Sequence, residues 1–402
     1  MRKEWPTKPL QSLCDDSKQD IVDGPFGSEL QRRDYITEGA PVLKIQNIKP
    51  FAIELKKMDF VSAEKFEALR RHSFRNGDIV MTKLGSPLGV SAIVENLESG
   101  IIVADLVRIR AQRVDTRFLC YQLNSQQTAD FINAQQKGTT RPRVTLSVVR
   151  ELPILVPLPA EQGRIVGVLD EVFFSLATAQ AHAEKNLQNA RALFESHLQS
   201  VFTQRGKGWV EKLLGEICEV KDGTHDSPKY VSEGVPFVTQ KNIREDGLSL
   251  EKIKFISPKD HHDFYRRSNV ALGDILISMI GANRGMACIV DDDRTFSIKN
   301  VGLVKQNAAM NQQFLLFFLK SPPAADYVRT VSKGGAQEFV GLTQLRKWPV
   351  PVPALKVQEA LAEQFLSLAA EIQRLETIYQ QKQSALVELK KSLLHQAFSG
   401  AL

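Results

Sequence analysis

The stretch Tyr35-Ile36-Thr37-Glu38-Gly39-Ala40-Pro41-Val42 decides how this chain is organised, because it returns as Tyr230-Val231-Ser232-Glu233-Gly234-Val235-Pro236-Phe237. Other matches follow in the same order, 195 to 196 residues apart: Gln46-Asn47-Ile48 with Lys241-Asn242-Ile243, Gly77–Val80 with Gly273–Leu276, and Gly89–Val94 with Gly285–Val290. A period near 200 residues is too long for a solenoid repeat. The sequence therefore predicts two whole modules, related by a pseudo-twofold axis.

Each module divides into a globular part and a helical part. The globular part mixes β-rich runs such as Ala40–Ile48 and Asp78–Leu84 with helical pieces such as Arg117–Gln135, which is typical of an α+β domain. Proline runs at Leu152–Pro159 and Trp348–Pro353 then precede the helices, because proline blocks helix propagation back into the domain. We expect domains at 1–155 and 207–355, and helices at 156–206 and 356–402.

Both helical parts repeat apolar residues at alternating steps of four and three, which is typical of a coiled coil. The first seam comprises Ile165, Leu169, Val172, Leu176, Ala179, Ala183, Asn186, Ala190, Leu193 and His197. The second comprises Leu361, Phe365, Leu368, Ile372, Leu375, Tyr379, Lys382, Leu386, Leu389 and Leu393. A helix of ~40 residues is about 60 Å long. We expect an α+β fold: two similar globular domains separated by a long antiparallel two-helix coiled coil.

The net charge of +6 lies on the two globular parts. Residues 1–155 carry 23 Lys and Arg against 19 Asp and Glu, and residues 207–355 carry 20 against 17. This mild basic excess suits contact with phosphate. No basic N-terminal leader precedes an apolar run, and no apolar stretch reaches the ~18 residues of a membrane span, so we expect a cytoplasmic protein. The four cysteines are far apart, which favours reduced thiols over a zinc site.

The sequence lacks the catalytic motifs that would mark it as an enzyme. It has no G-x-x-x-x-G-K-[ST] loop for a triphosphate and no H-E-x-x-H metal site. Ser321-Pro322-Pro323-Ala324 is interpreted as a turn that stops a helix, and His261-His262-Asp263 as the solvated start of another. We therefore look for binding residues.

Glycine-rich loops with basic flanks recur in both modules and are the candidate DNA contacts. Glycine lets the backbone approach a partner closely, while Lys, Arg and Thr bind phosphate and Arg or Gln can read base edges. Two of these loops, Asp23–Ser28 and Asp222–His225, open the two domains. The others are residues 83–89 and 137–143 in the first module, and 279–285 and 333–339 in the second. The candidate DNA-binding residues are Lys83, Lys137, Gly138, Thr139, Thr140, Arg141, Arg143, Lys241, Asn242, Arg284, Lys333, Gly334 and Gln337.

Together these stretches resemble the specificity subunits of type I restriction-modification enzymes over essentially the whole chain. The resemblance rests on Asp23–Ser28 as D-G-x-F-G-S, on the Tyr35–Ile48 stretch, on the G-D-I block at Gly77, and above all on Leu152–Gln162 with its prolines before Glu161-Gln162. The second copy departs from the family pattern, since Lys356-Val357-Gln358-Glu359 replaces the acidic-Gln pair.

The resemblance implies a function. The two domains would be target recognition domains, each reading half of a bipartite site in double-stranded DNA. The helices would be spacers that bind methyltransferase (modification) subunits, with nuclease/translocase (restriction) subunits added in the full enzyme. S-adenosylmethionine, ATP and Mg would belong to those partners, and this chain would bind no cofactor.

Two other classes of function stay open at this point. One is a nuclease or methyltransferase with an unrecognised site. The other is a free-standing DNA-binding regulator or a structural protein that uses its coiled coil to dimerise.

Overall fold

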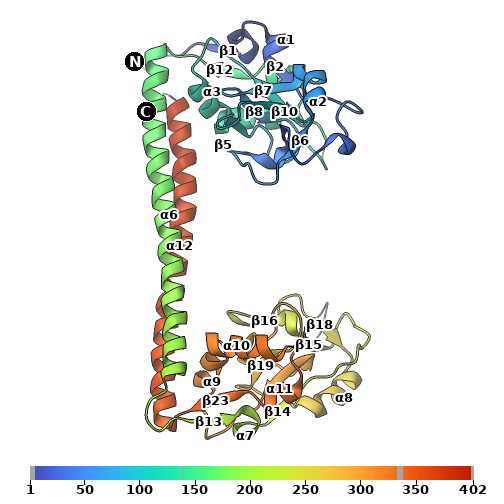
Figure 1. The fold of residues 1–402 in the computed structure, drawn as a ribbon, viewed down its shortest axis with the longest axis vertical. Helices are drawn as coiled ribbons and strands as arrows, with labels where there is room; N and C mark the ends of the chain where they lie inside the picture. The colour runs from blue at the N-terminus through green and yellow to red at the C-terminus, as the bar shows by residue number, and fades with distance from the viewer. Residues whose placement is uncertain (1–4, 139, 333–337, 400–402) are drawn as a thin grey trace. The chain divides into compact units, whose positions relative to one another are not determined.

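A computed structural model describes residues 5–138, 140–332 and 338–399. The chain forms two compact units, one of Met1–His182 with Gln381–Leu402 and the other of Ala183–Gln380 (Figure 1). Each unit therefore combines a globular domain with a segment of both long helices.

The domain of the first unit contains two four-stranded sheets. One has the order β2 (Ile21–Asp23), β11 (Leu106–Ile109), β8 (Ile79–Thr82) and β9 (Ser91–Ile93), all antiparallel. The other has the order β6 (Asp59–Val61), β3 (Ala40–Leu43), β10 (Ser99–Ile102) and β7 (Ser73–Arg75), in which β10 and β3 are parallel. Two-stranded sheets join β1 (Thr7–Pro9) to β12 (Pro153–Leu155), and β4 (Ile48–Lys49) to β5 (Ala52–Ile53).

The domain of the second unit repeats this topology. Its sheets are β14 (Val220–Asp222), β22 (Val301–Val304), β19 (Ile275–Ser278) and β20 (Ala287–Ile289); β18 (Lys254–Ile256), β15 (Val235–Thr239) and β21 (Ser297–Lys299); β13 (Val210–Leu213) with β23 (Pro349–Val352); and β16 (Ile243–Arg244) with β17 (Gly247–Leu248). The order β14-β22-β19-β20 matches β2-β11-β8-β9, and β18-β15-β21 matches β6-β3-β10, with no counterpart of β7 among the described residues. Strands β15 and β21 are again parallel. The duplication and the α+β class predicted from sequence are confirmed.

Short helices surround these sheets. In the first unit they are α1 (Ser17–Asp20), α2 (Ala63–Ala68), α3 (Thr116–Leu123), α4 (Gln126–Gln135) and α5 (Leu146–Arg150). In the second they are α7 (Leu214–Ile217), α8 (Pro258–Ser268), α9 (Gln312–Leu319), α10 (Pro322–Val331) and α11 (Leu342–Arg346). The predicted helical stretch 117–135 is thus two helices. A helix stops before Ser321, as expected, but Pro322, Pro323 and Ala324 begin α10 instead of forming a turn. Ser257 caps α8 by accepting a hydrogen bond from Asp260 N, and residues 261–263 lie in the first half of that helix.

The two long helices are α6 (Pro159–Gln204) and α12 (Leu355–Phe398), with 46 and 44 residues. A buried glutamine in the first turn ties each one to its domain. Gln162 donates to the carbonyl of Pro157 at 2.8 Å and accepts from the backbone N of Asp115, the N-cap of α3, at 2.8 Å. Gln358 does the same with Pro353 and Asn311, at 2.9 Å each. The glutamine of the recognised motif is therefore a structural clamp.

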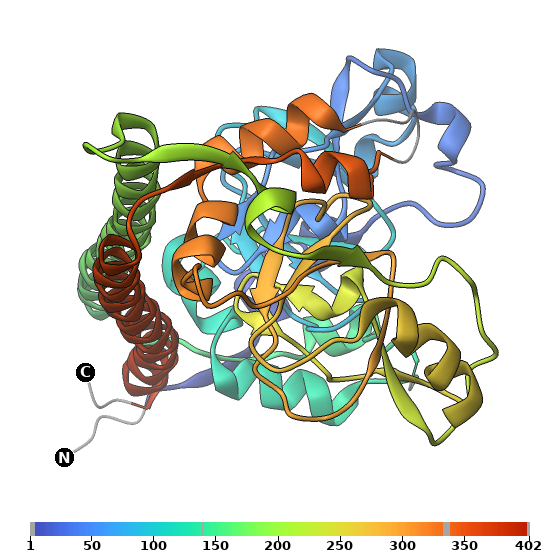
Figure 2. The ribbon, with the colours of Figure 1, turned by 90° about the horizontal axis from the view of Figure 1, so that it is seen from below.

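Segments of α6 and α12 pack together within each unit (Figures 1 and 2). In the first unit the core contains Ile165 and Leu169 from α6 with Leu394 from α12. In the second it contains Leu198 from α6 with Phe365 from α12. The start of each helix thus meets the end of the other, which is the antiparallel pairing expected from sequence.

The seam between the helices differs from the prediction at one of its two positions over much of its length, although Ile165 at the start of α6 is buried as predicted. Leu193 and Leu389, placed inside by sequence, are 72% and 45% exposed. The residue after each predicted one faces inward instead: Phe173, Phe194 and Lys390 are only partly exposed.

Aromatic packing against the domains explains this correction. Phe173 lies 5.5 Å from Phe51 and 5.4 Å from Tyr121 between ring centroids, and Phe194 lies 6.1 Å from Phe317. Both phenylalanines reach their domain only if this face of α6 is turned inward. Large aromatic side chains contribute more burial than the neighbouring aliphatic ones, so they select the face.

The end of each long helix completes a core. Phe398, at the end of α12, is 2% exposed in the core of the first unit, where its ring lies 5.4 Å from that of Phe118. Phe202, at the equivalent place in α6, is 2% exposed in the second unit, 5.3 Å from Phe318. The end of α12 therefore belongs to the core of the first unit.

Within the described residues, no helix is both long enough and apolar enough to span a membrane.

Candidate nucleic-acid interface

Two loops that the sequence singled out lie next to each other in the first unit. The glycine-rich loop 83–89 and the basic loop 137–143 are joined by hydrogen bonds from Gly85 N to the carbonyl of Pro142 and from Val144 N to the carbonyl of Lys83, at 2.9 Å each. Lys137 and Arg143 bond to each other through both backbone groups, also at 2.9 Å. The two ends of loop 137–143 are therefore joined to each other and held against loop 83–89.

The turn exposes a group of hydrogen-bond donors. The side chain of Arg141 is 69% exposed, with one nitrogen 3.4 Å from Asp105, and Lys137, Thr140 and Arg143 are also exposed. Gly138 takes φ +87°, and a Cβ there would lie 3.1 Å from the carbonyl oxygen of Arg141. Glycine thus permits the turn. Thr139, the remaining candidate of this loop, lies outside the described residues.

Lys83 has a different place from the one expected. Its side chain is 10% exposed, and its ammonium lies 2.5 Å from Asp23 and 4.6 Å from the centre of the Phe26 ring. A buried ammonium that already has a carboxylate partner is not free to bind phosphate. We therefore assign Lys83 to the framework, where it anchors the loop that opens the domain.

Asn242 is likewise used inside the protein, whereas its neighbour Lys241 is exposed. The Asn242 amide accepts from Thr239 N at 2.9 Å and donates to the carbonyl of Ser249 at 3.0 Å, and it is 9% exposed. Asn47 makes the equivalent bonds with Lys44 and Glu54 in the first unit. This asparagine therefore closes a turn common to both domains.

The same pair of loops is found in the second unit, 196 residues later. Gly281 N donates to the carbonyl of Glu338 at 3.2 Å, and Val340 N to the carbonyl of Met279 at 2.8 Å. Arg284 is 21% exposed, donates to Ser332 Oγ at 2.8 Å and pairs with Glu338. The candidates Lys333, Gly334 and Gln337 lie outside the described residues.

The opening loop of each domain passes so close to a neighbouring strand that only glycine fits. A Cβ on Gly24 would lie 2.1 Å from the carbonyl carbon of Val103, and one on Gly223 would lie 2.2 Å from the carbonyl oxygen of Ile298. The aspartate before each glycine is held by cations. Asp23 pairs with Lys83, whereas Asp222 receives both Nε and Nη2 of Arg267, at 2.9 and 2.7 Å.

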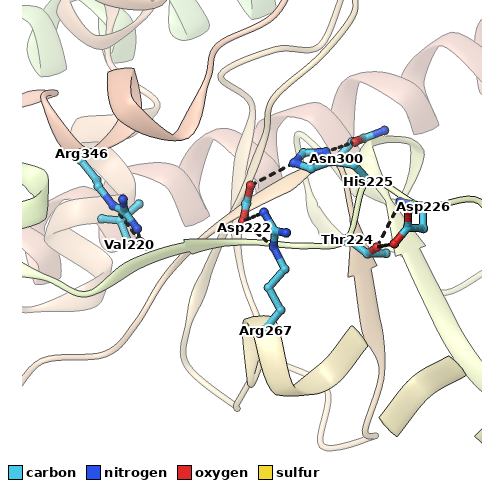
Figure 3. Close-up of polar contacts among 8 residues, drawn as sticks. All are labelled: Val220, Asp222, Thr224, His225, Asp226, Arg267, Asn300 and Arg346. Carbon is cyan, nitrogen blue, oxygen red and sulfur yellow. Dashed lines mark hydrogen bonds and ion pairs between the residues drawn. The ribbon is translucent and has the colours of Figure 1, made fainter. Parts of the chain in front are cut away.

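Sequence reasoning missed part of the second opening loop, which Figure 3 shows. His225 lies 3.1 Å from Asp222 through Nε2 and 2.7 Å from Asn300 Oδ1 through Nδ1. Thr224 and Asp226 bond to each other in the same loop, and Arg346 donates to the carbonyl of Val220 behind it. Arg267 and Asn300 come from elements distant in sequence from this loop. Arg267 matches Arg71 at the 196-residue offset, but the repeat alone does not mark either residue as a partner of the opening loop.

The titratable groups of the cores are poor candidates for chemistry. All four cysteines are free and buried, and burial raises the pKa of Cys14, Cys120 and Cys288 to about 12. A protonated thiol is a weak nucleophile. Among residues 5–138, 140–332 and 338–399, no group of three or more His, Cys, Asp or Glu side chains is placed to hold a metal ion.

Comparison with known proteins found similarity to one family over part of the chain. The model of the family described as "Type I restriction modification DNA specificity domain" matches residues 206–382. The MjaVIII specificity subunit of Methanocaldococcus jannaschii is 22% identical, covering 76% of this chain and 75% of that protein. The EcoBI specificity subunit of Escherichia coli is 21% identical, covering 74% and 68%.

Solved structures show the same fold. A chain from a study of complex assembly and conformational transition in the type I R-M system has a TM-score of 0.76 at 18% identity, covering 100% of this chain and 99% of that one. The HsdS subunit from Thermoanaerobacter tengcongensis has a TM-score of 0.60 at 19% identity, covering 100% and 98%.

Proposed function

This chain is a relative of the type I restriction-modification specificity subunits, and from that premise we propose that it reads a two-part DNA site for a multisubunit enzyme. Each domain, at residues 1–155 and 207–355, reads one half of the site. The loops that carry Lys137 to Arg143 and Lys333 to Phe339 provide part of the contact in their respective domains.

One observation carries this proposal: the two domains keep the loop pair and change its side chains. Backbone bonds that join Leu84 and Gly85 to loop 137–143 recur for Ile280 and Gly281. On that shared frame, Pro142 and Arg143 are replaced by Glu338 and Phe339. A kept framework with changed exposed groups is what two readers of different sequences require, because side chains at base edges supply specificity.

The test measures DNA binding by the full chain with its methyltransferase subunits, comparing Arg141→Ala and Arg143→Ala with Arg70→Ala. Arg70 is a matched control, since its side chain is 77% exposed and pairs with Glu67 on the neighbouring turn. If either loop arginine reads a base, its loss costs ~1–3 kcal/mol and relaxes specificity at one position of one half-site. A phosphate contact instead weakens all sequences alike and lowers the salt slope by about one. Affinity and salt dependence equal to those of Arg70→Ala in both variants would remove the loop from the interface.

We further propose that the chain itself is not catalytic, and that S-adenosylmethionine, ATP and Mg bind to its partner subunits. The basis is the absence of recognisable catalytic motifs from the sequence. The purified chain, incubated with labelled S-adenosylmethionine and a duplex carrying its site, should transfer no methyl group. Transfer by the chain alone would contradict this.

The methyltransferase subunits would bind the exposed apolar side chains of the long helices. Leu193 in one unit and Leu389 in the other occupy equivalent positions and are 72% and 45% exposed. Phe174 is 75% exposed on the same pair of helices. We take these exposed apolar side chains as candidate contacts for a partner, and the duplication supplies one of the leucines for each of two subunits. The nuclease/translocase subunits would then join that complex.

Leu193→Glu and Leu389→Glu test this assignment, with Asn186→Glu, also on an exposed helix position, as the control. Each leucine variant should bind one methyltransferase subunit fewer in analytical ultracentrifugation, while the control binds the full number. Full binding by both leucine variants would place the partner surface elsewhere.

The long helices would also set the unread spacer between the half-sites. Seven residues added to both α6 and α12 keep the heptad seam and lengthen each helix by about 10 Å. At 3.4 Å per base pair this corresponds to roughly three more base pairs. Selection from a library of spacer lengths should show that shift. An unchanged spacer in a folded variant would exclude the helices as the ruler.

A further inference from the structure

The second domain contains a polar chain that links a buried carboxylate to an exposed turn (Figure 3). It runs from Arg267 on α8 to Asp222 at the end of β14, then to His225 and to Asn300 in the turn between β21 and β22. The Asp222 side chain is 7% exposed, whereas that of His225 is 57% exposed. This series of hydrogen-bonded side chains therefore leads from the buried framework to the protein surface.

The Arg267 guanidinium fixes Asp222, because its two nitrogens both bind Oδ1 of the carboxylate. The other oxygen, Oδ2, remains for Nε2 of His225 at 3.1 Å. The imidazole is thus held in one orientation, with Nδ1 aimed at the Asn300 amide at 2.7 Å. Two more charged residues belong to the same loop and turn: Asp226, which bonds to Thr224, and Lys299, which precedes Asn300 and whose ammonium lies 2.5 Å from Ser227 Oγ.

The charge of His225 determines which end of the Asn300 amide faces outward. A protonated imidazole donates from both nitrogens, so Asn300 must turn its oxygen toward Nδ1 and its NH₂ group outward. A neutral imidazole that donates from Nε2 to Asp222 has only a lone pair on Nδ1. Asn300 must then turn its NH₂ group inward and its oxygen outward.

Asn300 lies in a turn whose equivalent in the first domain carries a residue that contacts the basic loop. The equivalent turn there, between β10 and β11, carries Asp105, whose carboxylate lies 3.4 Å from Arg141 in the basic loop. Asn300 is partly exposed, takes φ +52° and donates its backbone N to the carbonyl of Thr224. Among the described residues, no hydrogen bond from its side-chain nitrogen is found.

We propose that Asn300 reads one base of the half-site recognised by the second domain, and that His225 is a positioning residue which selects the atom that Asn300 presents. With the NH₂ group outward, Asn300 donates to the major-groove oxygens of guanine or thymine; with the oxygen outward, it accepts from the amino groups of adenine or cytosine. The preferred base at this position therefore changes from keto at low pH to amino at high pH. This inference rests on the proposed function, since it requires that the domain reads DNA.

The experiment selects preferred sites from a random library with the full chain and its methyltransferase subunits at about pH 5.5 and about pH 8.5, on either side of the range in which histidine changes charge. We expect a change of about 2- to 10-fold in keto over amino preference at one position of one half-site. The other half-site is read by the first domain and is the internal control. Bipartite selection by the unmodified protein establishes the proposed function independently of this result.

Three variants separate the roles. Asn300→Gly keeps the left-handed backbone and should lose the preference at that position. Asn300→Asp offers only acceptors when ionised and should prefer amino bases at both pH values. His225→Phe, which carries the residue of the equivalent position Phe26, should leave no pH dependence there, while His262→Gln, on the exposed face of α8, should retain it.

An unchanged base preference in Asn300→Gly would overturn the role of Asn300. A pH dependence that persists in His225→Phe, or that is absent from the unmodified protein while Asn300→Gly changes the preference, would overturn the role of His225.

Discussion

Replacing Phe398 by alanine should destabilise the first domain, although this residue lies 243 positions beyond residue 155, where that domain ends in sequence. Its ring is 2% exposed and packs edge-on against Phe118 with centroids 5.4 Å apart. Removing a buried phenylalanine ring costs ~3–5 kcal/mol, because transfer from water and contacts with neighbours are both lost. For a unit of this size the midpoint of thermal unfolding should fall by about 6–20 °C.

Amide hydrogen exchange locates the effect. In Phe398→Ala, exchange in the buried strands β8 and β11 should accelerate by about 100- to 4000-fold, while β19 and β22 of the second unit keep their rates. Phe202→Ala, the equivalent change, should show the reverse. Phe174→Ala is the control for removal of a ring that is 75% exposed, and should cost less than about 0.5 kcal/mol. Equal acceleration in both units, or in neither, would refute the assignment of the end of α12 to the first core.

Three further predictions concern the helices and the cores. Leu193→Glu should leave the midpoint of thermal unfolding within about 2 °C, because Leu193 is exposed. Phe194→Glu should lower that midpoint by several degrees, because Phe194 is partly buried against the second core. Equal effects would restore the seam predicted from sequence. Gln162→Ala should cost ~1–3 kcal/mol in urea unfolding, since it leaves the Asp115 backbone N without its side-chain acceptor; a cost below 0.5 kcal/mol would show that the clamp is dispensable. Burial raises the pKa of Cys120 from 9.0 to about 12, so the thiol of the native protein should resist alkylation at pH 8. The stability of the fold should decrease as the pH rises above about 9, because the thiol ionises first in the unfolded chain. Rapid labelling of the native protein would contradict this.

The sequence predicts the duplication and the long helices well because these signals are local or repeated. A proline run marks where each helix begins, and α6 and α12 start within three residues of the predicted boundaries at 156 and 356. The matches around Tyr35 and Tyr230 correspond to equivalent strands, β3 and β15. A pattern that recurs in order over two modules has few alternative explanations.

The sequence could not predict which face of each long helix packs inward, because apolar residues occupy both of the neighbouring positions that could form the seam. Val172 and Phe173 are neighbours, as are Leu193 and Phe194, so a heptad pattern fits either set. Packing of the phenylalanines against their own domain decides between them, and that packing depends on Phe317, more than 100 residues away.

The candidate interface was predicted at the level of loops but not of every side chain. The loops themselves were predicted correctly, because glycine and turn residues identify loops reliably. In both units, backbone hydrogen bonds join the two predicted loops to each other. Whether a polar side chain in them faces solvent depends on distant partners. Lys83 meets Asp23 from 60 residues away, and Asn300 meets His225 from 75 residues away.

The central claim, that each domain reads one half of a bipartite site, is tested most directly by exchanging one domain. Residues 1–155 are replaced by the matching part of a related specificity subunit, and the hybrid is assembled with its methyltransferase subunits. The bound sites are then determined by selection from a random duplex library. The account predicts that one half-site changes to that of the donor and the other stays as it was. A hybrid that folds and assembles but changes both half-sites, or neither, would contradict it.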